Sequence, residues 1–438
     1  MKLKPLVLAI ALSGVSTASF SAGFQVFQQN ASGLGNAYAG SAAVADNAST
    51  VFYNPAGMTE LKGNHVSVGL NVTDASIKFT NGSSSVSGLA SAGNGGNAGT
   101  TPLIPNGYFT SQIDEKLTFG MGIGAPFGSH SKYDGAWVGG AQALEFNIKT
   151  INLNPSIAYK LNEVVSLGFG LNFQKLDADY KRITGTITTY PVAVGNSTFY
   201  ANLTTGLTHM DLSDNSSYGW NAGALFKLDD RTKIGISYRS AIKHSLSGSL
   251  TTSGVSSTTP GIGGAVDATG TGPGSANVKL PDMAFLSVVH KYNDTVEILG
   301  DVSWTGWSSI PKIDVYNLAS SSLAQTLVTD FKDSWRFALG ANYQYASNLK
   351  LKAGVAYDKT PVKSPDTRLV SLPDNDRTWL TVGTQWKYDK DSVVDIGLAR
   401  VFIKNSDVNN DQRPARGLVN GSYKSSAWLF GLQYSRAF

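Results

Sequence analysis

The sequence predicts an all-β fold, a transmembrane antiparallel β-barrel of about 14 strands whose lumen is plugged by a small N-terminal helical hatch. Three observations predict it. After about residue 64 the chain repeats segments in which every second residue is apolar, the connections alternate between short and long, and the chain ends on a strand with one bulky apolar face. Charged residues make up only 15% of the chain, which is low for a soluble surface.

Residues 1–21 read as a secretory signal. Lys2 and Lys4 are followed by the apolar run PLVLAIAL and by a small-residue end, so we place cleavage before Ala22. The alternative, a membrane anchor, is weaker because the apolar core is too short to span ~30 Å of hydrocarbon. The chain has no cysteine, which excludes disulfides and thiolate chemistry. It also has no basic run that could follow a phosphate backbone, so no nucleic-acid partner is expected.

Residues 22–63 do not alternate and are predicted to form the hatch. The segment is rich in Ala, Gly and Asn, and a short helix should end at Asn54-Pro55 because proline disfavours helix in the residue before it. We expect the turn of Asn54, Pro55 and Ala56 to anchor the hatch against the wall near the third strand. A dinucleotide fingerprint would need its third glycine at Tyr38, so no cofactor is expected.

Residues 64–438 are predicted to form the barrel, and the segment VVSLGFGLNFQ (164–174) shows the pattern. Its odd-numbered positions from 165 to 173 are large and apolar, whereas the even-numbered positions are Ser, Gly, Asn and Gln. Such alternation indicates a strand with one apolar face. The small polar residues of the other face suit a barrel lumen better than bulk solvent.

The connections predict the number of strands. Short turns occur at 114–115, 162–163, 229–231, 293–294, 346–348 and 389–391. Long loops rich in Gly, Ser, Thr and Asn fall at about 80–101, 126–147, 183–216, 248–276, 306–330, 359–376 and 404–424. This alternation gives about 14 strands and is typical of a bacterial outer-membrane barrel. A soluble β-sandwich or propeller would not place long loops at every second connection.

The last segment, AWLFGLQYSRAF, is predicted to close the barrel by pairing with the first strand near 66–79, because a spanning sheet must leave no edge. Phe438 should lie in the periplasmic aromatic girdle, and we expect the barrel-assembly machinery to bind this strand. The protein is thus expected to be a monomeric, multi-pass outer-membrane protein of a Gram-negative bacterium, in contact with outer-membrane lipid. The side chains expected to face lipid are Trp428, Phe430, Leu432 and Tyr434.

The sequence also resembles a known family. The stretch AGFQVFQQNASGLGNAYAGSAAVADNASTVFYNPAGM, which begins at Ala22, is similar to the start of mature FadL-type outer-membrane long-chain fatty acid transporters. Later stretches match as well, namely SWTGWS (303–308), FKDSWRFALGANYQY (331–345) and SLPDNDRTWLTVGTQW (371–386). The resemblance implies that a hydrophobic substrate binds outside between loops, passes to an interior pocket and leaves sideways through a gap in the wall.

Three residues are candidates for the lumen path. If the alternation of 165–173 continues, even-numbered residues face the lumen, so Arg182 faces inward and Lys181 outward, provided that no bulge intervenes. The resemblance aligns Arg182 with a basic pocket residue; the alternative is an interfacial arginine at a loop base. Asp358 is also inward by parity, where it contacts the hatch or, the more common case, is a solvated lumen acid. Phe24, at the start of the mature chain, is placed with Arg182 as ligand-binding.

The segment GIGAPFGSHSKY (122–133) carries a candidate lateral opening at Pro126, Phe127 and Gly128. Proline cannot donate to a sheet ladder, and the glycines just before it suggest a weakly paired wall. The resemblance implies a kinked third strand whose missing hydrogen bonds open the wall. The alternative is the end of a strand before a loop.

Together these features favour a passive channel for long-chain fatty acids or similar hydrophobic molecules. Uptake of aromatic or alkane hydrocarbons is the alternative, and a general diffusion porin is a weaker one because it would need no plug. An enzyme is not expected, because the five histidines are scattered without metal-ligand spacing and there is no Gly-x-Ser-x-Gly elbow.

Overall fold

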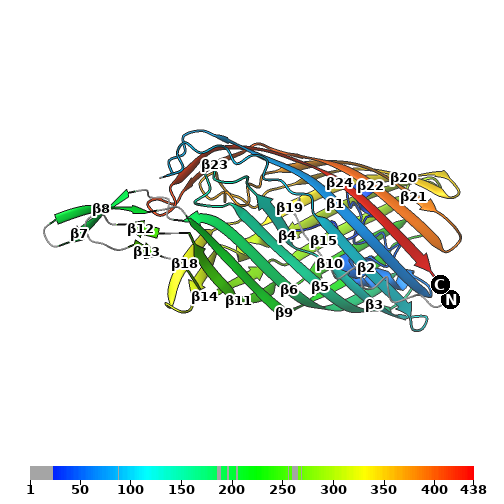
Figure 1. Cartoon of the computed structure of the whole chain (residues 1–438). Helices are drawn as coiled ribbons and strands as arrows, with labels where there is room; N and C mark the ends of the chain where they lie inside the picture. The colour runs from blue at the N-terminus through cyan, green and yellow to red at the C-terminus, as the bar shows by residue number, and fades with distance from the viewer. Residues whose placement is uncertain are drawn as a thin grey trace.

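The computed structural model describes residues 23–86, 88–184, 189–194, 197–203, 206–254, 256–258, 265–267 and 269–438. The predicted signal segment lies outside these residues. The described chain forms a closed antiparallel barrel of 14 strands, which confirms the predicted fold class (Figure 1). No helix in the described ranges is long and apolar enough to cross a membrane.

Several of the 14 strands are interrupted and appear as two consecutive segments. In order around the wall the strands are β1 (Asn64–Asn81), β2 (Leu103–Gln112), β3 (Leu117–Gly124) with β4 (Gly128–Lys132), β5 (Glu145–Lys160), β6 (Val165–Thr184), β9 (Gly206–Lys227), β10 (Thr232–Arg239) with β11 (Ile242–Ser253), β14 (Gly270–Leu280) with β15 (Met283–Lys291), β16 (Val296–Thr305) with β17 (Lys312–Asn317), β18 (Ser322–Val328) with β19 (Ser334–Ala346), β20 (Leu349–Asp358), β21 (Arg377–Lys387), β22 (Ser392–Ile403) with β23 (Ser406–Asp411), and β24 (Leu418–Ala437). A separate small sheet at the loop end is built from β7 (Thr189–Val194), β8 (Ser197–Leu203), β12 (Ser256–Thr258) and β13 (Ala265–Asp267) (Figure 1).

The barrel closes between its first and last strands, as predicted. β1 and β24 pair in register from His65 with Ala437 to Asn81 with Gly421. The chain end is held by backbone hydrogen bonds, with Phe438 N donating to Asn64 O at 2.9 Å and Asn64 N donating to Phe438 O at 3.1 Å. The bulky face of β24 is exposed on the outer surface through Trp428, Phe430, Leu432 and Tyr434. A terminal phenylalanine therefore closes the sheet instead of fraying.

The two ends of the barrel differ as the connections predicted. All six predicted short turns lie at one end, together with the C-terminus, and the long loops lie at the other (Figure 1). The bounds of some loops were wrong, because β9 already begins at Gly206 and β11 continues to Ser253. These strand ends pair with each other beyond the apolar band, where the apolar residues, such as Met210 and Leu250, face the lumen and the outward residues are mostly polar. The outward apolar alternation that marked the other strands is therefore absent.

The alternation in β6 orients its side chains as predicted. Leu167, Phe169 and Leu171 are exposed on the outer surface, and Asn172 and Gln174 are buried in the lumen. The β6–β9 ladder has a register shift beside Gln174, but the extra residue lies on β9. The parity of β6 therefore continues unbroken toward the loops.

Residues 23–63 lie inside the barrel and include η1 (Leu34–Asn36), α2 (Thr50–Tyr53) and η2 (Pro55–Glu60). η1 packs on β19 to β22, where the wall is lined by glycine. A side chain at Gly354 would overlap the backbone of Asn36, and one at Gly383 would overlap Gly35, so the absence of side chains permits this close approach. A further short helix, η3 (Trp307–Ser309), lies between β16 and β17.

Candidate functional site

The lumen face changes from polar to apolar along the strands. On β6, Asn172 and Gln174 are followed by Leu176 and Tyr180, which are also buried. The expectation of a small polar inner face therefore holds only for the half nearer the short turns. The buried apolar side chains of the other half are Phe146, Ile148, Leu176, Tyr180, Met210, Leu212, Leu246, Leu250, Val278, Leu280, Val315 and Leu327, in one cluster with apolar residues of the hatch.

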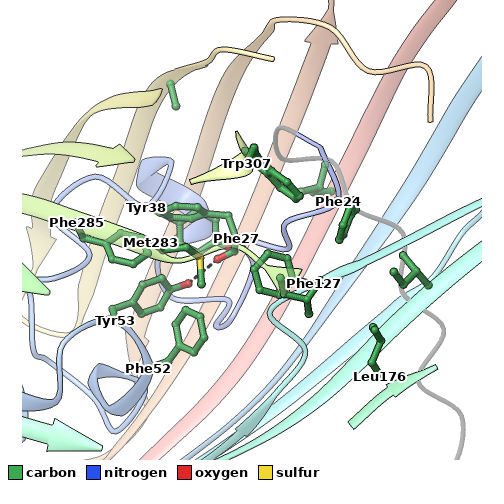
Figure 2. Packing of buried hydrophobic residues seen from close by; sticks show 14 of the residues in the cluster. Phe24, Phe27, Tyr38, Phe52, Tyr53, Phe127, Leu176, Met283, Phe285 and Trp307 are labelled. Carbon is green, nitrogen blue, oxygen red and sulfur yellow. Dashed lines mark hydrogen bonds between the residues drawn. The ribbon is translucent and has the colours of Figure 1, made fainter. Parts of the chain in front are cut away.

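Phe24 lies in an aromatic group at the edge of this cluster (Figure 2). Its ring centroid is 4.7 Å from that of Trp307 and 6.1 Å from that of Phe127, in edge-to-face arrangements. Trp307 also contacts Phe331 at 5.8 Å. The structure thus brings together Phe24, a predicted ligand-binding residue, and Phe127, a residue of the predicted opening.

The third strand is interrupted at residues 125–127, between β3 and β4. The β2–β3 ladder stops at Gly107 with Ile123, and the strand resumes on β5 only at Gly128. In between, the chain pairs with the N-terminal segment, with Val26 N donating to Pro126 O and Gly128 N donating to Phe24 O, each at 2.8 Å. The missing ladder bonds lie at the segment that the sequence singled out.

The glycines before this interruption do not weaken the wall, which corrects the prediction. Gly120 and Gly122 pair with both β2 and β5, and Gly124 pairs with β5. A side chain at Gly120 would collide with Met58 and Val51 of the hatch, and one at Gly124 would collide with Gln29. These two glycines make room for the hatch, and the break in pairing with β5 begins only after Gly124.

Arg182 points into the lumen, as the parity of β6 predicted. Its Nε donates to Oε1 of the buried Gln325 at 3.1 Å. Lys181 faces outward and pairs with Glu145 at 3.0 Å. No ion pair joins Arg182 to a carboxylate within the described parts of the chain.

A second arginine shares this region and was missed by the sequence reasoning. Arg416, in the connection between β23 and β24, lies near enough to Arg182 for their charges to repel. Its Nη1 donates to Gln412 Oε1 at 3.2 Å, and burial lowers the pKa of its guanidinium. Its position in a predicted loop carried no parity signal that could have placed it inward.

The Asn54 turn anchors the hatch, although not where it was expected. α2 ends at Tyr53, and the fully buried Asn54 side chain donates to Ala42 O at 2.7 Å and to Ala224 O of β9 at 3.0 Å, while accepting from Ala56 N at 3.1 Å. Pro55 and Ala56 lie against Gly168 of β6, where a side chain would overlap them. The turn therefore meets β6 and β9, because glycine in those strands admits its backbone. The third strand is contacted by other hatch residues.

Asp358 is not a solvated acid of the lumen. Its carboxylate is buried, lies 2.9 Å from Arg336 Nε and accepts a hydrogen bond from Trp379 Nε1 at 2.9 Å. Arg336 in turn donates through Nη2 to Ala37 O of the hatch at 2.6 Å and stacks on Phe27 at 4.3 Å. Asp358 therefore reaches the hatch through an arginine.

Arg336 is one of several wall cations that bind hatch carbonyl groups. Lys233 donates to Val44 O at 3.0 Å, Arg239 to Phe52 O at 3.1 Å and Lys352 to Ser32 O at 2.8 Å. The sequence signal, a cation at an inward position of a strand, was available but was read only at Arg182. These contacts fix the body of the hatch to the wall.

The arrangement defines a class of protein: an outer-membrane β-barrel channel with an internal plug, an interrupted wall strand and an apolar upper lumen, meaning the half of the lumen nearer the long loops. Within the described residues no group of three His, Asp or Glu side chains could hold a metal ion. The chain belongs to the family of outer membrane protein transport proteins (OMPP1/FadL/TodX), whose model matches residues 12–438.

Relatives of known name agree with this assignment. The chain is 30% identical over 452 residues to the long-chain fatty acid transport protein of Escherichia coli O6:H1, covering 98% of each chain. It is 29% identical over 467 residues to outer membrane protein P1 of Haemophilus influenzae, covering 99% of this chain and 98% of the relative. The protein is accordingly a multi-pass protein of the Gram-negative outer membrane.

Solved structures show the same fold. A FadL homologue from Pseudomonas aeruginosa superimposes with a TM-score of 0.82 at 24% identity, covering 95% of this chain and all of the other. The toluene transporter TbuX of Ralstonia pickettii gives a TM-score of 0.63 at 18% identity, covering 93% of this chain and 99% of the other. At these identities the likeness concerns the fold.

Proposed function

We propose that the protein carries long-chain fatty acids or similar hydrophobic molecules passively across the outer membrane. The observation that supports this most directly is an apolar lumen lining that ends beside two arginines, Arg182 and Arg416, with no carboxylate partner among the described residues. Each methylene removed from water contributes about 0.8 kcal/mol, so a long acyl chain binds such a surface without an energy source. The carboxylate needs a cation when it leaves water, and Arg182 is placed to supply it.

The proposed path runs from the loops to the interrupted third strand. The acyl chain lies among the apolar side chains of the upper lumen and reaches the aromatic group of Phe24, Phe127 and Trp307. Movement of hatch residues beside Pro126 then opens the wall, where β2 has no ladder partner on the side of the third strand. The substrate enters the bilayer sideways through one barrel, so a monomer suffices.

Arg182→Ala tests the carboxylate site. Loss of a charged hydrogen bond should weaken oleate binding by about 1.5–3 kcal/mol, and binding of the methyl ester should hardly change. Lys181→Ala, which removes the outward neighbour, is the matched control. Equal losses for acid and ester would mean that Arg182 only supports the wall.

Uptake of aromatic hydrocarbons is the second candidate, favoured by the aromatic group around Trp307 and by the fold shared with toluene transporters. Competition between oleate and toluene for the purified protein separates the two. Binding of neither, with high conductance to small sugars, would favour a porin.

A further inference from the structure

The outer surface of the barrel carries an apolar hollow that the transport path does not use. It has a volume of about 600 Å³ and lies across β16, β19 to β22 and β24. Its floor includes Ala341 and Ala353, which are register partners on neighbouring strands. Larger exposed side chains surround them, namely Ile298, Leu339, Val355, Leu380, Val382 and Leu398. Small residues enclosed by large ones give this part of the wall a groove fit for an acyl chain.

An arginine lies at one edge of the hollow. Arg400 is on β22, in register between Leu380 and Trp428. Its guanidinium carbon is 5.0 Å from the ring centroid of Trp428 and 5.5 Å from that of Phe402, both exposed on the lipid-facing surface. These rings hold the cation by cation–π attraction and leave its hydrogen-bond donors available.

Arg400 has no counter-ion in the described parts of the chain. An outward carboxylate at this level, Asp74, lies on the far side of Trp428 and accepts a hydrogen bond from Thr101 at 3.1 Å. A cation on the lipid-facing surface of a barrel is costly unless it reaches an interface or an anion. Any charged partner of Arg400 therefore comes from outside the described chain.

The height of Arg400 identifies the leaflet. It lies eight residues beyond Ser392, where β22 leaves a short turn at the periplasmic end. At about 3.3 Å per residue on a strand tilted by about 40°, this is roughly 20 Å above the turn, near the far edge of an apolar band about 25 Å tall. The anion that meets Arg400 therefore belongs to the outer leaflet.

We propose that the hollow and Arg400 form a binding site for a phosphate-bearing lipid of the outer leaflet. One acyl chain lies over Ala341 and Ala353. The planar guanidinium of Arg400 donates two parallel hydrogen bonds to the phosphate. The interrupted third strand does not line the hollow, so the occupant is a resident lipid and not departing substrate. The inner side of the same floor supports η1, because Gly340 and Gly354 lie against Asn36.

Native mass spectrometry of the purified full-length protein tests the site. Diphosphoryl lipid A should be retained by the wild type, and retention should fall about tenfold or more in Arg400→Gln, which loses the charged hydrogen bonds. Ala353→Leu, which fills the floor, should lose lipid as well. The matched controls are Lys424→Gln, an exposed cation on β24 outside the hollow, and Ala284→Leu, a change on β15 outside it.

The lipid probes decide the chemistry. Dephosphorylated lipid A should bind the wild type as weakly as diphosphoryl lipid A binds Arg400→Gln. Equal retention of the two lipids, or undiminished retention by Arg400→Gln, would overturn the proposal. Retention of oleate that depends on Arg400 and excludes lipid A would overturn it too, by making the hollow a substrate site.

Discussion

Replacing Asn54 with alanine should release the hatch locally without unfolding the barrel. The side chain makes three buried hydrogen bonds, to Ala42 O, Ala224 O and Ala56 N. At about 0.5–1.5 kcal/mol each, their loss destabilises the turn by roughly 1.5–4.5 kcal/mol. None of them belongs to the barrel ladder, so the wall keeps its pairing.

Hydrogen exchange measures this release directly. Each 1.4 kcal/mol is a factor of ten in an equilibrium, so amides of residues 50–61 should exchange roughly 10 to 1,600 times faster in Asn54→Ala. Amides of β1 and β24 should be unchanged, and the protein should still shift on gels when heated. A less firmly held hatch should also raise the frequency of channel openings in planar bilayers.

The matched control is Asn410→Ala. Asn410 is likewise buried and donates to two carbonyl groups, Asp366 O at 3.3 Å and Arg368 O at 3.2 Å, but these belong to the loop between β20 and β21, whose hydrogen bond to the hatch is at Gly23 and not at residues 50–61. Unchanged exchange of residues 50–61 in Asn54→Ala, or equal acceleration in both variants, would refute the anchoring role.

Other predictions follow from the same contacts. Gly223→Val should displace the hatch, because a side chain there overlaps Asn54 Oδ1, and should raise conductance while the barrel stays folded. Cysteines replacing Gln25 and Phe127, which form a β-bridge in a chain with no cysteine, should form a disulfide that blocks hydrophobe uptake until reduced; uptake by the oxidised protein would place the exit elsewhere. Arg239→Gln removes a charged hydrogen bond to Phe52 O and should speed exchange around α2, whereas Arg231→Gln in an exposed turn should not.

The barrel was predictable because the bilayer restricts which residues can face lipid, and this restriction is visible in the sequence. Lipid requires an apolar residue at every second position and a closed sheet, and β6 and β24 follow both rules. The strand ends beyond the lipid, such as the start of β9 at Gly206, have mostly polar outward residues, and their apolar residues Met210 and Leu212 face the lumen. No outward apolar alternation marks these ends, so they were read as loops.

The site was predictable only where it lay on a strand of known parity. The inward direction of the Arg182 side chain followed from the alternation up to Phe173, because the bulge lies on the neighbouring strand β9 and leaves the alternation of β6 intact. Arg416 lies in an irregular connection, where side-chain direction depends on the folded loop. The roles of Gly168 and Gly223 depend on which hatch residue meets them, and that contact joins segments more than 100 residues apart.

The contacts of the hatch also limit how a path can open. Lys233, Arg239, Arg336 and Lys352 each bind a hatch carbonyl through a charged hydrogen bond worth about 1.5–3 kcal/mol, so expulsion of the whole hatch would break four of them together. The segment around Phe24 is held to the third strand by neutral backbone bonds, worth about 0.5–1.5 kcal/mol each, and Gly23 N adds one charged hydrogen bond to Asp374 Oδ2 at 3.0 Å. On the proposed path, opening the wall therefore costs less free energy if only these first residues move. A substrate that displaces Phe24 from Phe127 and Trp307 replaces aromatic contacts with its own apolar surface, which lowers that cost further.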